Sequence, residues 1–285
     1  MWATEDWKDY ECIDTAEGMK LERWGNIVLS RPDPQVIWKK KCDEKAWNRA
    51  NAVYKRSSTG GGSWDYRKSI PDRWTVSYKH LTFNIKTMGF KHTGLFPEQA
   101  VNWDYMAEKL KDRPGANVLN LFGYTGAATM ACSAAGANVC HVDASKGMVQ
   151  WAKENALSCG LENNYIRYIV DDCMKFVERE IRRGKKYDAI IMDPPSYGRG
   201  PSGEVWKLEE CLWDFIERCA LLLSDDPIFF LVNSYTTGLQ PTVMKNILEL
   251  TLPEGKVEAD EIGLPVSNGK IYLPCGATAR WEKTK

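Results

Sequence analysis

The pattern of apolar and polar positions changes near residue 90. Before it, apolar residues alternate with polar ones in the segments 74–78 and 81–85, which predicts two half-buried strands joined by a turn. The segments 27–29 and 36–38 are interpreted as two more strands, and 57–63 as a loop rich in glycine and serine. Residues 1–90 are therefore predicted to form a small, mostly β module.

Beyond residue 100, strands and helices are expected to alternate. The unbroken apolar run 187–192 is typical of a strand that is buried on both faces, as in a parallel sheet. Strands are expected near 117–121, 138–142, 165–170, 187–192 and 228–233, and helices near 126–135, 145–159, 173–184, 207–223 and 239–250. Two final strands, near 256–262 and 271–279, close the pattern. Residues 91–285 are therefore predicted to form a second domain with a Rossmann-like α/β sheet.

A glycine-punctuated turn follows the first strand of this sheet. Gly123 and Gly126 stand between the apolar run 117–122 and a helix that opens with small residues. Glycines let a ligand approach the backbone, and a helix N-terminus offers free N–H groups. The glycine spacing is shorter than in G-x-G-x-x-G, and no Lys-Ser or Lys-Thr follows, so the loop is not shaped for a diphosphate. A ligand with a carboxylate, a ribose and an adenine fits better, and S-adenosylmethionine is such a ligand.

Acidic residues stand at the ends of the next two strands. Asp143, 20 positions after Gly123, is expected to accept hydrogen bonds from the ribose hydroxyls. Its alternative role is a helix cap, for which Ser145 is better placed. Asp171 and Asp172 end the third strand, and one of their carboxylates is expected to accept from the adenine amino group. Asp172 is equally placed to cap the following helix.

The fourth strand ends in Asp193-Pro-Pro-Ser-Tyr197. Two prolines fix the backbone and remove two donors, which leaves their carbonyl groups to accept hydrogen bonds from the amino group of a nucleobase. Tyr197 offers a face on which a flipped base stacks. Pro-Pro is also a common loop stiffener. Beside a candidate cofactor loop, however, the pattern favours a site in which Asp193, Pro194, Pro195 and Tyr197 orient the group that is modified.

Charge is unevenly distributed, although 38 basic residues balance 38 acidic ones. Residues 20–92 hold 16 basic and six acidic residues. Local positive charge attracts a polyanion even when the whole chain is neutral, so nucleic acid is a candidate partner, with a solvated basic surface as the alternative. Seven of the twelve tryptophans precede residue 75. They either fill the core of the module or stack on RNA bases, and we favour the core.

The cysteines and histidines argue against a metal site. Nine cysteines form no C-x-x-C pair, and only three histidines occur. Free thiols in a reducing cytoplasm are the simplest account of the cysteines. We recognise no secretory signal and no segment long enough to span a bilayer, and therefore expect a cytoplasmic protein without a membrane partner. The oligomeric state is left open.

These motifs resemble those of a known family. The segments Lys91-His-Thr-Gly-Leu-Phe-Pro-Glu-Gln99, Asn120-Leu-Phe-Gly-Tyr-Thr-Gly126, Val142-Asp-Ala-Ser145 and Asp193-Pro-Pro195 occur in this order. They are similar to class I S-adenosylmethionine-dependent methyltransferases related to bacterial large-subunit ribosomal RNA methyltransferases, of the cytosine-C5 and guanine-N7 types. The resemblance covers about residues 90–285. It implies the Rossmann-like sheet of that class, S-adenosylmethionine as cofactor, and RNA, specifically ribosomal RNA, as substrate.

The resemblance also implies roles for individual residues. Lys91, Thr93 and Gln99 are expected to help close the cofactor pocket. Cofactor contacts are expected along the loops that follow the first four strands of the larger domain, from Asn120, Phe122, Gly123, Tyr124, Thr125, Gly126, Asp143, Ala144, Asp172, Cys173 and Asp193.

One departure from the family affects the chemistry. Cytosine-C5 enzymes add a cysteine thiolate to the base, and in the similar enzymes that cysteine lies just past the fifth strand. Tyr235 stands at the corresponding place here, and no cysteine lies in 193–200. Cys211 falls within a predicted helix, where an apolar role is expected. Direct methyl transfer to a nitrogen or oxygen is therefore favoured over C5 chemistry.

The leading interpretation is a methyltransferase that modifies a base of ribosomal RNA. Two other interpretations stay open at this point. One is a methyltransferase whose substrate is a small molecule or a protein side chain, and the other is a non-catalytic RNA-binding protein with the same fold. Asp143, Asp172 and Asp193 together argue against the second, since a protein that only binds RNA does not need all three.

Overall fold

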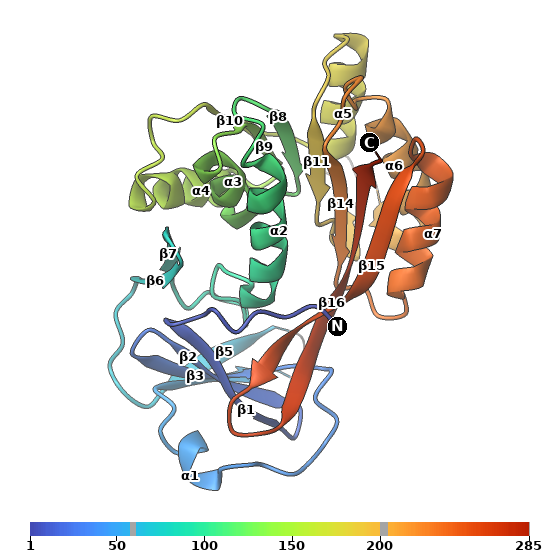
Figure 1. Ribbon diagram of the computed structural model, residues 1–285. Helices are drawn as coiled ribbons and strands as arrows, with labels where there is room; N and C mark the ends of the chain where they lie inside the picture. Colours follow the sequence, from blue (N-terminus) through green and yellow to red (C-terminus); the bar gives the residue numbers. More distant parts are fainter. Residues whose placement is uncertain (58–60, 200–204, 285) are drawn as a thin grey trace. The chain divides into compact units, whose positions relative to one another are not determined.

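The computed structural model describes residues 1–57, 61–199 and 205–284 (Figure 1). The chain separates into two compact units. The larger unit comprises Met1, Asn102–Ile262 and Gly276–Lys285, and the smaller one comprises Trp2–Val101 and Gly263–Cys275. The strands β15 (Gly255–Val266) and β16 (Ile271–Lys283) contribute to both. The smaller unit thus includes a carboxy-terminal segment that the division at residue 90 assigns to the other domain.

The sheet of the larger unit has the strand order β10-β9-β8-β11-β14-β16-β15. Neighbours among the first five strands are parallel, and β16 runs antiparallel to β14. The parallel strands are β8 (Asn117–Leu121), β9 (Asn138–Asp143), β10 (Ile166–Val170), β11 (Ala189–Met192) and β14 (Phe229–Ser234). Each lies within about two residues of its predicted bounds. The Rossmann-like α/β fold closed by a strand pair is therefore confirmed.

Helices cover both faces of this sheet. They are α2 (Ala100–Leu110), α3 (Ala127–Ala134), α4 (Lys146–Ser158), α5 (Cys173–Arg182), α6 (Leu208–Ala220) and α7 (Pro241–Thr251). Figure 1 shows α2, α3 and α4 on one side of the sheet, and α5, α6 and α7 on the other. Successive strand residues alternate between two apolar clusters: Ile191 packs in the cluster that includes α2 and α3, and Ile190 in the cluster that includes α5, α6 and α7. Burial on both faces explains the unbroken apolar runs.

Helix α2 is an element that the sequence-based expectations leave out. Its residues Trp103, Met106 and Leu110 are each at most 3 % exposed. Their spacing of three and four positions is the helical period, so the sequence does carry the signal.

The smaller unit is mostly β, as predicted. Its sheet has the order β15-β1-β2-β3-β4-β5. Its strands are β1 (Tyr10–Ala16), β2 (Met19–Trp24), β3 (Ile27–Pro32), β4 (Ala52–Arg56) and β5 (Gly62–Tyr66), with the short helix α1 (Glu44–Trp47) before β4. The strands β6 (Trp74–Tyr78) and β7 (Leu81–Ile85) form the predicted hairpin, and the 3-10 helix η1 (Pro97–Gln99) follows. Of the predicted loop 57–63, residues 58–60 lie outside the described residues, and Gly62 begins β5.

The predicted strand at 36–38 is wrong. The carbonyl groups at its two ends accept hydrogen bonds from the N–H groups of Gly18 and Glu17, which form the tight turn between β1 and β2. Further along, the buried Asp14 carboxylate accepts from the Cys42 and Asp43 N–H groups. The segment is therefore held as irregular chain by bonds to the β1–β2 turn, which alternation in the sequence does not reveal.

The tryptophans of this unit are structural. Trp24 is fully buried. Five indole N–H groups donate to acceptors inside the unit, at distances of 2.7–3.1 Å: those of Trp7, Trp38, Trp47, Trp64 and Trp74. An indole that is packed and hydrogen-bonded in this way is fixed in the core. The core interpretation is thus supported for most of the amino-terminal tryptophans.

A buried ion pair joins β2 and β3. Arg31 donates from Nε and Nη2 to the two carboxylate oxygens of Glu22, at 2.6 and 2.8 Å, and the Tyr10 hydroxyl donates to the same carboxylate at 2.7 Å. Glu22 is fully buried and Arg31 is 5 % exposed. Burial alone raises the pKa of Glu22, but the charges of Arg31 and Lys20 outweigh it and hold that pKa at about 2. The buried carboxylate and the buried guanidinium therefore compensate each other's charge.

Replacing Glu22 by Gln is expected to lower the free energy of unfolding of the smaller unit by about 3–5 kcal/mol, because it leaves the Arg31 guanidinium buried without a counter-charge. Urea unfolding followed by tryptophan fluorescence measures this change. Glu11→Gln is the matched control. Glu11 pairs with Arg23 between β1 and β2, but both side chains are about a third exposed. That substitution should cost under about 1 kcal/mol.

The same pair predicts a pH dependence. The folded-state pKa of Glu22, about 2, lies below the ordinary value of about 4.3 for glutamate. Its contribution to stability is therefore fully present above about pH 5 and is lost as the pH falls toward 2. The stability difference between the wild type and E22Q should shrink across this range, and a constant difference would contradict the assignment.

Candidate active site

The loops of the candidate site begin side by side at one edge of the larger unit's sheet. Leu121 of β8 is paired with Val142 of β9 and with Met192 of β11. The segments that start at Phe122, Asp143 and Asp193 therefore leave the sheet next to one another. Open parallel sheets bind ligands at this carboxyl edge.

The loop after β8 has a strained backbone. Phe122 and Tyr124 adopt φ of +55° and +51°, the left-handed region that residues with a side chain rarely occupy, and Gly126 adopts +86°. The loop is fixed by hydrogen bonds from Gly123 N to the Val142 carbonyl and from Gly126 N to the Gly123 carbonyl, each 2.9 Å long. Strain that the surroundings enforce in this way concentrates at ligand-binding loops.

Gly123 lies against a buried histidine. A Cβ at this position would sit 2.5 Å from two atoms of the His141 ring, which leaves no room for another residue. His141 is fully buried, and its Nδ1 lies 2.9 Å from Thr129 Oγ1, which also accepts from Asn120 Nδ2 at 2.9 Å. Burial lowers the pKa of His141 to about 4, so the ring is neutral at physiological pH. The Asn120 amide therefore belongs to the buried network of Thr129 and His141.

Asp143 supports the loop from the end of β9. Its carboxylate accepts from Tyr124 N at 2.9 Å and from Ser145 N at 2.8 Å, and burial raises its pKa. Ser145 caps α4 by accepting from Met148 N, so the capping role falls to Ser145 as expected. A carboxylate has about four acceptor positions, and Asp143 uses two of them here. The remaining positions suit a diol.

Helix α3 begins at this loop without a side-chain cap, since its first flanking residue is Gly126. An uncapped helix N-terminus presents N–H groups and a partial positive charge. The backbone of Thr125, just before the helix, is held in place because the buried Asn155 Nδ2 donates to the Thr125 carbonyl at 2.8 Å. The loop therefore offers donors at a fixed position, which suits a carboxylate ligand.

The residues after β10 have mixed roles. Asp172 accepts from Lys175 N at 2.9 Å and thereby caps α5, whereas Asp171 is paired with Arg179. Asp172 thus acts as a helix cap, one of the two roles expected for it. The capping bond uses one carboxylate oxygen and leaves the other for a ligand. Cys173 is buried and accepts from Phe122 N at 3.3 Å, and burial raises the pKa of its thiol. Its sulfur supports the loop as a neutral thiol.

Asp193 stands at one end of a hydrogen-bonded chain that sequence reasoning missed. Its carboxylate accepts from Asn233 Nδ2 at 3.0 Å, and Asn233 Oδ1 accepts from the Thr278 hydroxyl at 2.6 Å. Thr278 accepts in turn from Asn102 Nδ2 at 3.0 Å, and Arg280 donates twice to Asn102 Oδ1. Asn102, Asn233 and Thr278 are each at most 1 % exposed. Every amide in this chain has its orientation fixed, and so does the carboxylate at its end.

The proline loop differs in part from its expected arrangement. The Pro195 carbonyl accepts from the indole of Trp206 at 2.7 Å, so it is already engaged, and Pro194 is buried. Tyr197, which begins β12 (Tyr197–Arg199), is 52 % exposed. It is paired with Lys207 of β13 (Val205–Lys207). The ring therefore lies on the surface at this edge.

Trp206 is a further residue that the sequence did not single out. Its ring lies 5.6 Å from those of Phe122 and Phe215. It thus connects the proline loop to Phe122 of the cofactor loop. No spacing in the sequence points to this contact.

Three expected cofactor residues belong to the smaller unit. The Lys91 ammonium donates to the Pro32 carbonyl at 3.4 Å, and burial lowers its pKa, with Lys20, Arg31 and Arg56 acting in the same direction. Thr93 is fully buried, and its hydroxyl has no hydrogen-bond partner within the described ranges. Gln99 ends η1. Their role in closing the cofactor pocket stays a prediction.

Two features are absent from the part of the chain that the structure describes. No helix there is both long and apolar enough to cross a bilayer. The same residues contain no group of three or more His, Cys, Asp or Glu side chains that is placed to hold a metal ion.

Comparisons with known proteins agree with this fold. Residues 54–212 match the family described as S-adenosylmethionine-dependent methyltransferase. The crystal structure of a SAM-dependent methyltransferase from Agrobacterium tumefaciens is 34% identical, covers 99% of this chain and 93% of that one, and superimposes with a TM-score of 0.94. A putative SAM-dependent methyltransferase from Streptococcus mutans shares the fold, with a TM-score of 0.76 at 17% identity over 97% of this chain and 76% of that one.

Curated relatives are larger than this chain. The ribosomal RNA large subunit methyltransferase K/L of Shewanella frigidimarina is 34% identical over 46% of this chain and 17% of its own length. The protein of the same name from Shewanella woodyi is 34% identical over 65% of this chain and 24% of its own length. The chain thus matches about a fifth of the length of these relatives. From its fold, its loop geometry and these matches, the chain belongs to the S-adenosylmethionine-dependent methyltransferase family.

Proposed function

We propose that this methyltransferase transfers a methyl group to a nitrogen or oxygen atom of an RNA base, and that ribosomal RNA is its substrate. The excess of basic residues in 20–92, 16 against six acidic ones, is the observation that carries the RNA substrate. The printed names of the Shewanella relatives support ribosomal RNA in particular.

The residues at the sheet edge fit S-adenosylmethionine. Asp143 provides free acceptor positions for the ribose hydroxyls, and the uncapped start of α3 provides donors for the methionine carboxylate. Asp172 keeps one oxygen beyond its capping bond for the adenine amino group. When bound, the cofactor supplies a methyl group that its sulfonium centre has already activated. The work of the protein is therefore to position the acceptor atom and to exclude water.

The acceptor side is assigned to the proline loop. The Asp193 carboxylate is held by Asn233 and accepts a hydrogen bond from the base, while the exposed Tyr197 ring stacks on it. Of the two proline carbonyls, that of Pro194 is the better acceptor for the base, because Pro195 already accepts from Trp206.

Transfer to a nitrogen or oxygen is supported by the state of the thiols. Cys173, next to the cofactor loop, and Cys219 are buried, and burial raises the pKa of both. Cys211 lies half-buried in α6. A nucleophilic cysteine needs a lowered pKa and access to the base. Cys173 and Cys219 meet neither requirement.

Deleting the gene is expected to remove one methylated nucleoside from ribosomal RNA. Mass spectrometry of the nucleosides, compared with the parent strain and with a strain that carries the gene on a plasmid, measures this loss. The lost nucleoside should carry its methyl group on nitrogen or oxygen. Unchanged ribosomal RNA together with the loss of a methyl group from a protein or a small molecule would overturn the RNA substrate.

The absence of a covalent intermediate between a cysteine and the base can be tested separately. A C5 enzyme is trapped as an adduct on RNA that contains 5-fluorocytosine, because the fluorine blocks release, whereas a nitrogen methyltransferase forms no such intermediate. No adduct that resists denaturation is expected. An adduct that disappears on replacing a single cysteine by serine would restore the C5 assignment.

Asp143→Ala is expected to weaken the binding of S-adenosylhomocysteine by about 1–3 kcal/mol, because buried hydroxyls of the ribose lose their acceptor. Calorimetry on the purified protein measures this change. Glu162→Ala, a change of the same charge at an exposed position, is the control and should bind as the wild type does. Equal affinities of the two variants would refute the ribose assignment. Because burial raises the pKa of Asp143, its carboxylate should become protonated at a higher pH than an exposed aspartate. As the pH is lowered, affinity for S-adenosylhomocysteine should therefore begin to fall at a higher pH.

Thr278→Val is expected to lower kcat about tenfold, because it removes the hydroxyl that orients Asn233 and thereby Asp193. Affinity for S-adenosylhomocysteine should fall less than kcat, since Asp143 and the loop after β8 are untouched. Thr278→Ser retains the hydroxyl and is the matched variant that should restore turnover. If Val and Ser reduce kcat equally, the chain of hydrogen bonds does not position Asp193.

A further inference from the structure

The smaller unit contains a pocket of its own, where two strands separate. Strands β3 and β4 are paired only at Leu29–Ala52 and Ser30–Val53. Beyond these pairs β3 ends at Pro32, while β4 continues to Arg56 in its pairing with β5. The space between the diverging strands is a pocket of about 530 Å³. This volume lies within the range of about 300–1,000 Å³ that is typical of small-ligand sites.

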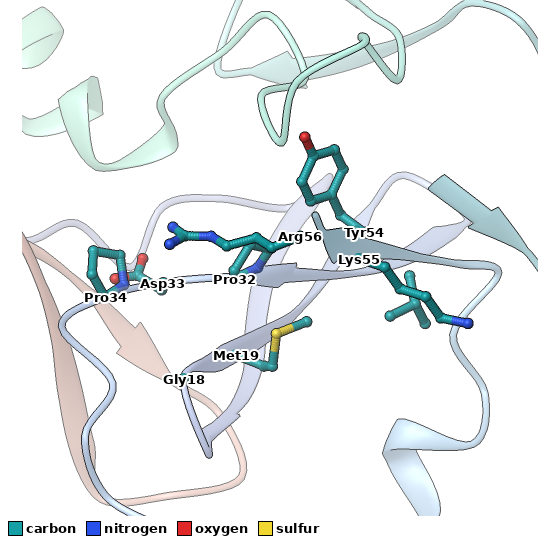
Figure 2. Close-up of a pocket in the computed structure, with 9 residues that line it drawn as sticks. Gly18, Met19, Pro32, Asp33, Pro34, Tyr54, Lys55 and Arg56 are labelled. Carbon is teal, nitrogen blue, oxygen red and sulfur yellow. The ribbon is translucent and has the colours of Figure 1, made fainter. Parts of the chain in front are cut away.

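The walls of the pocket combine apolar surface with the charged side chains of Asp33, Lys55 and Arg56. Met19, Pro32, Pro34 and Tyr54 contribute apolar groups. Figure 2 shows the Arg56 side chain extending from β4 toward Asp33 and Pro34. A flat apolar group fits such walls, and the guanidinium suits an anionic group attached to it.

The charges around the pocket leave Arg56 available. Asp33 accepts from Lys20 at 3.2 Å and from Gln35 N at 3.0 Å, so its carboxylate is already engaged. Within the described ranges, Arg56 has no ion-pair partner within 4.0 Å, and its neighbour Lys55 is paired with Asp65 at 2.8 Å. The Lys91 ammonium, bonded to the Pro32 carbonyl, adds positive charge near Arg56. An anion is therefore attracted to Arg56 without displacing an existing partner.

We propose that this pocket binds one nucleotide of the RNA substrate, with its phosphate on Arg56 and its base against Met19 and Pro32. This inference rests on the RNA substrate proposed above and adds a second site of contact to it. A nucleotide has the required combination of a planar apolar group and a charged one, and every base has a face that packs on apolar walls. The basic character of residues 20–92 matches a polyanion rather than an isolated uncharged ligand.

The test uses the full chain and an oligouridylate that contains 4-thiouridine. Arg56→Ala should weaken binding about tenfold and reduce the slope of log K against log[salt] by about 0.7, the share of one phosphate on a single strand. Arg49→Ala is the matched control. Arg49 is also an exposed arginine of the smaller unit, but it does not line the pocket. It should lose less than about twofold, as expected for a general change of charge.

Cross-linking locates the contact. Irradiation of the wild type should attach the oligonucleotide to the peptide that contains Met19 or to the one that contains Tyr54, and Arg56→Ala should abolish this product. Uridine monophosphate should compete with the oligonucleotide at concentrations at which inorganic phosphate does not. Competition by phosphate alone would reduce the pocket to a simple anion site and overturn the nucleotide assignment.

The outcomes separate this proposal from the RNA substrate itself. If Arg56→Ala and Arg49→Ala bind the oligonucleotide equally and no cross-link forms at the pocket, the pocket is refuted while the proposed function stands. If the wild type binds no RNA, both the nucleotide pocket and the proposed RNA substrate are refuted. Affinity for S-adenosylhomocysteine should be the same in the wild type and in both variants, which shows that the cofactor site of each variant is intact.

Discussion

The candidate site depends on how closely the loop after β8 approaches the end of β9. Gly123 rests on the ring of His141 with no space for a Cβ, and its N–H is bonded to the Val142 carbonyl. Tyr124 is tied to the Asp143 carboxylate in the same region. These contacts enforce the left-handed backbone of Phe122 and Tyr124, which costs of order 1–3 kcal/mol for each residue. The start of α3 and the Asp143 carboxylate are thereby fixed relative to each other, before any ligand arrives.

Sequence reasoning succeeded where the physical signal is local. The five parallel strands are continuous apolar runs that end at glycine, aspartate or proline, so both their existence and their order along the chain were predictable. The structure also places Gly123, Gly126 and Asp143 in the strand, turn and helix that their spacing indicates, while their contacts with the cofactor stay a prediction. The amino-terminal strands were harder to predict. In β2, the buried Glu22 stands where an apolar residue is expected, and its partner Arg31 lies on the next strand. A buried ion pair therefore hides the alternation of a strand.

The parts of the site that were missed depend on contacts between distant residues. Asn102, Asn233 and Thr278 come from three separate elements, and only the folded sheet brings them into one hydrogen-bonded chain toward Asp193. Trp206, on strand β13, donates to the Pro195 carbonyl, and no spacing in the sequence predicts that bond. Pairs that are separated by many residues leave no periodic trace in a single sequence. The side chains that are expected to contact the ligand follow a local pattern in the sequence, whereas those that hold them in place do not.

The sharing of β15 and β16 between the two units has a consequence for synthesis on the ribosome. Strand β1, near the start of the chain, is paired through Cys12 with Val266, and the smaller unit includes residues 263–275. Chains emerge from the ribosome in order, and domains generally fold as units when their residues are available. The amino-terminal strands must therefore wait, with the edge of β1 unpaired, until more than two hundred later residues have been made. A nascent chain that stalls before residue 263 exposes that edge to other chains, and synthesis of residues 263–275 allows it to be paired.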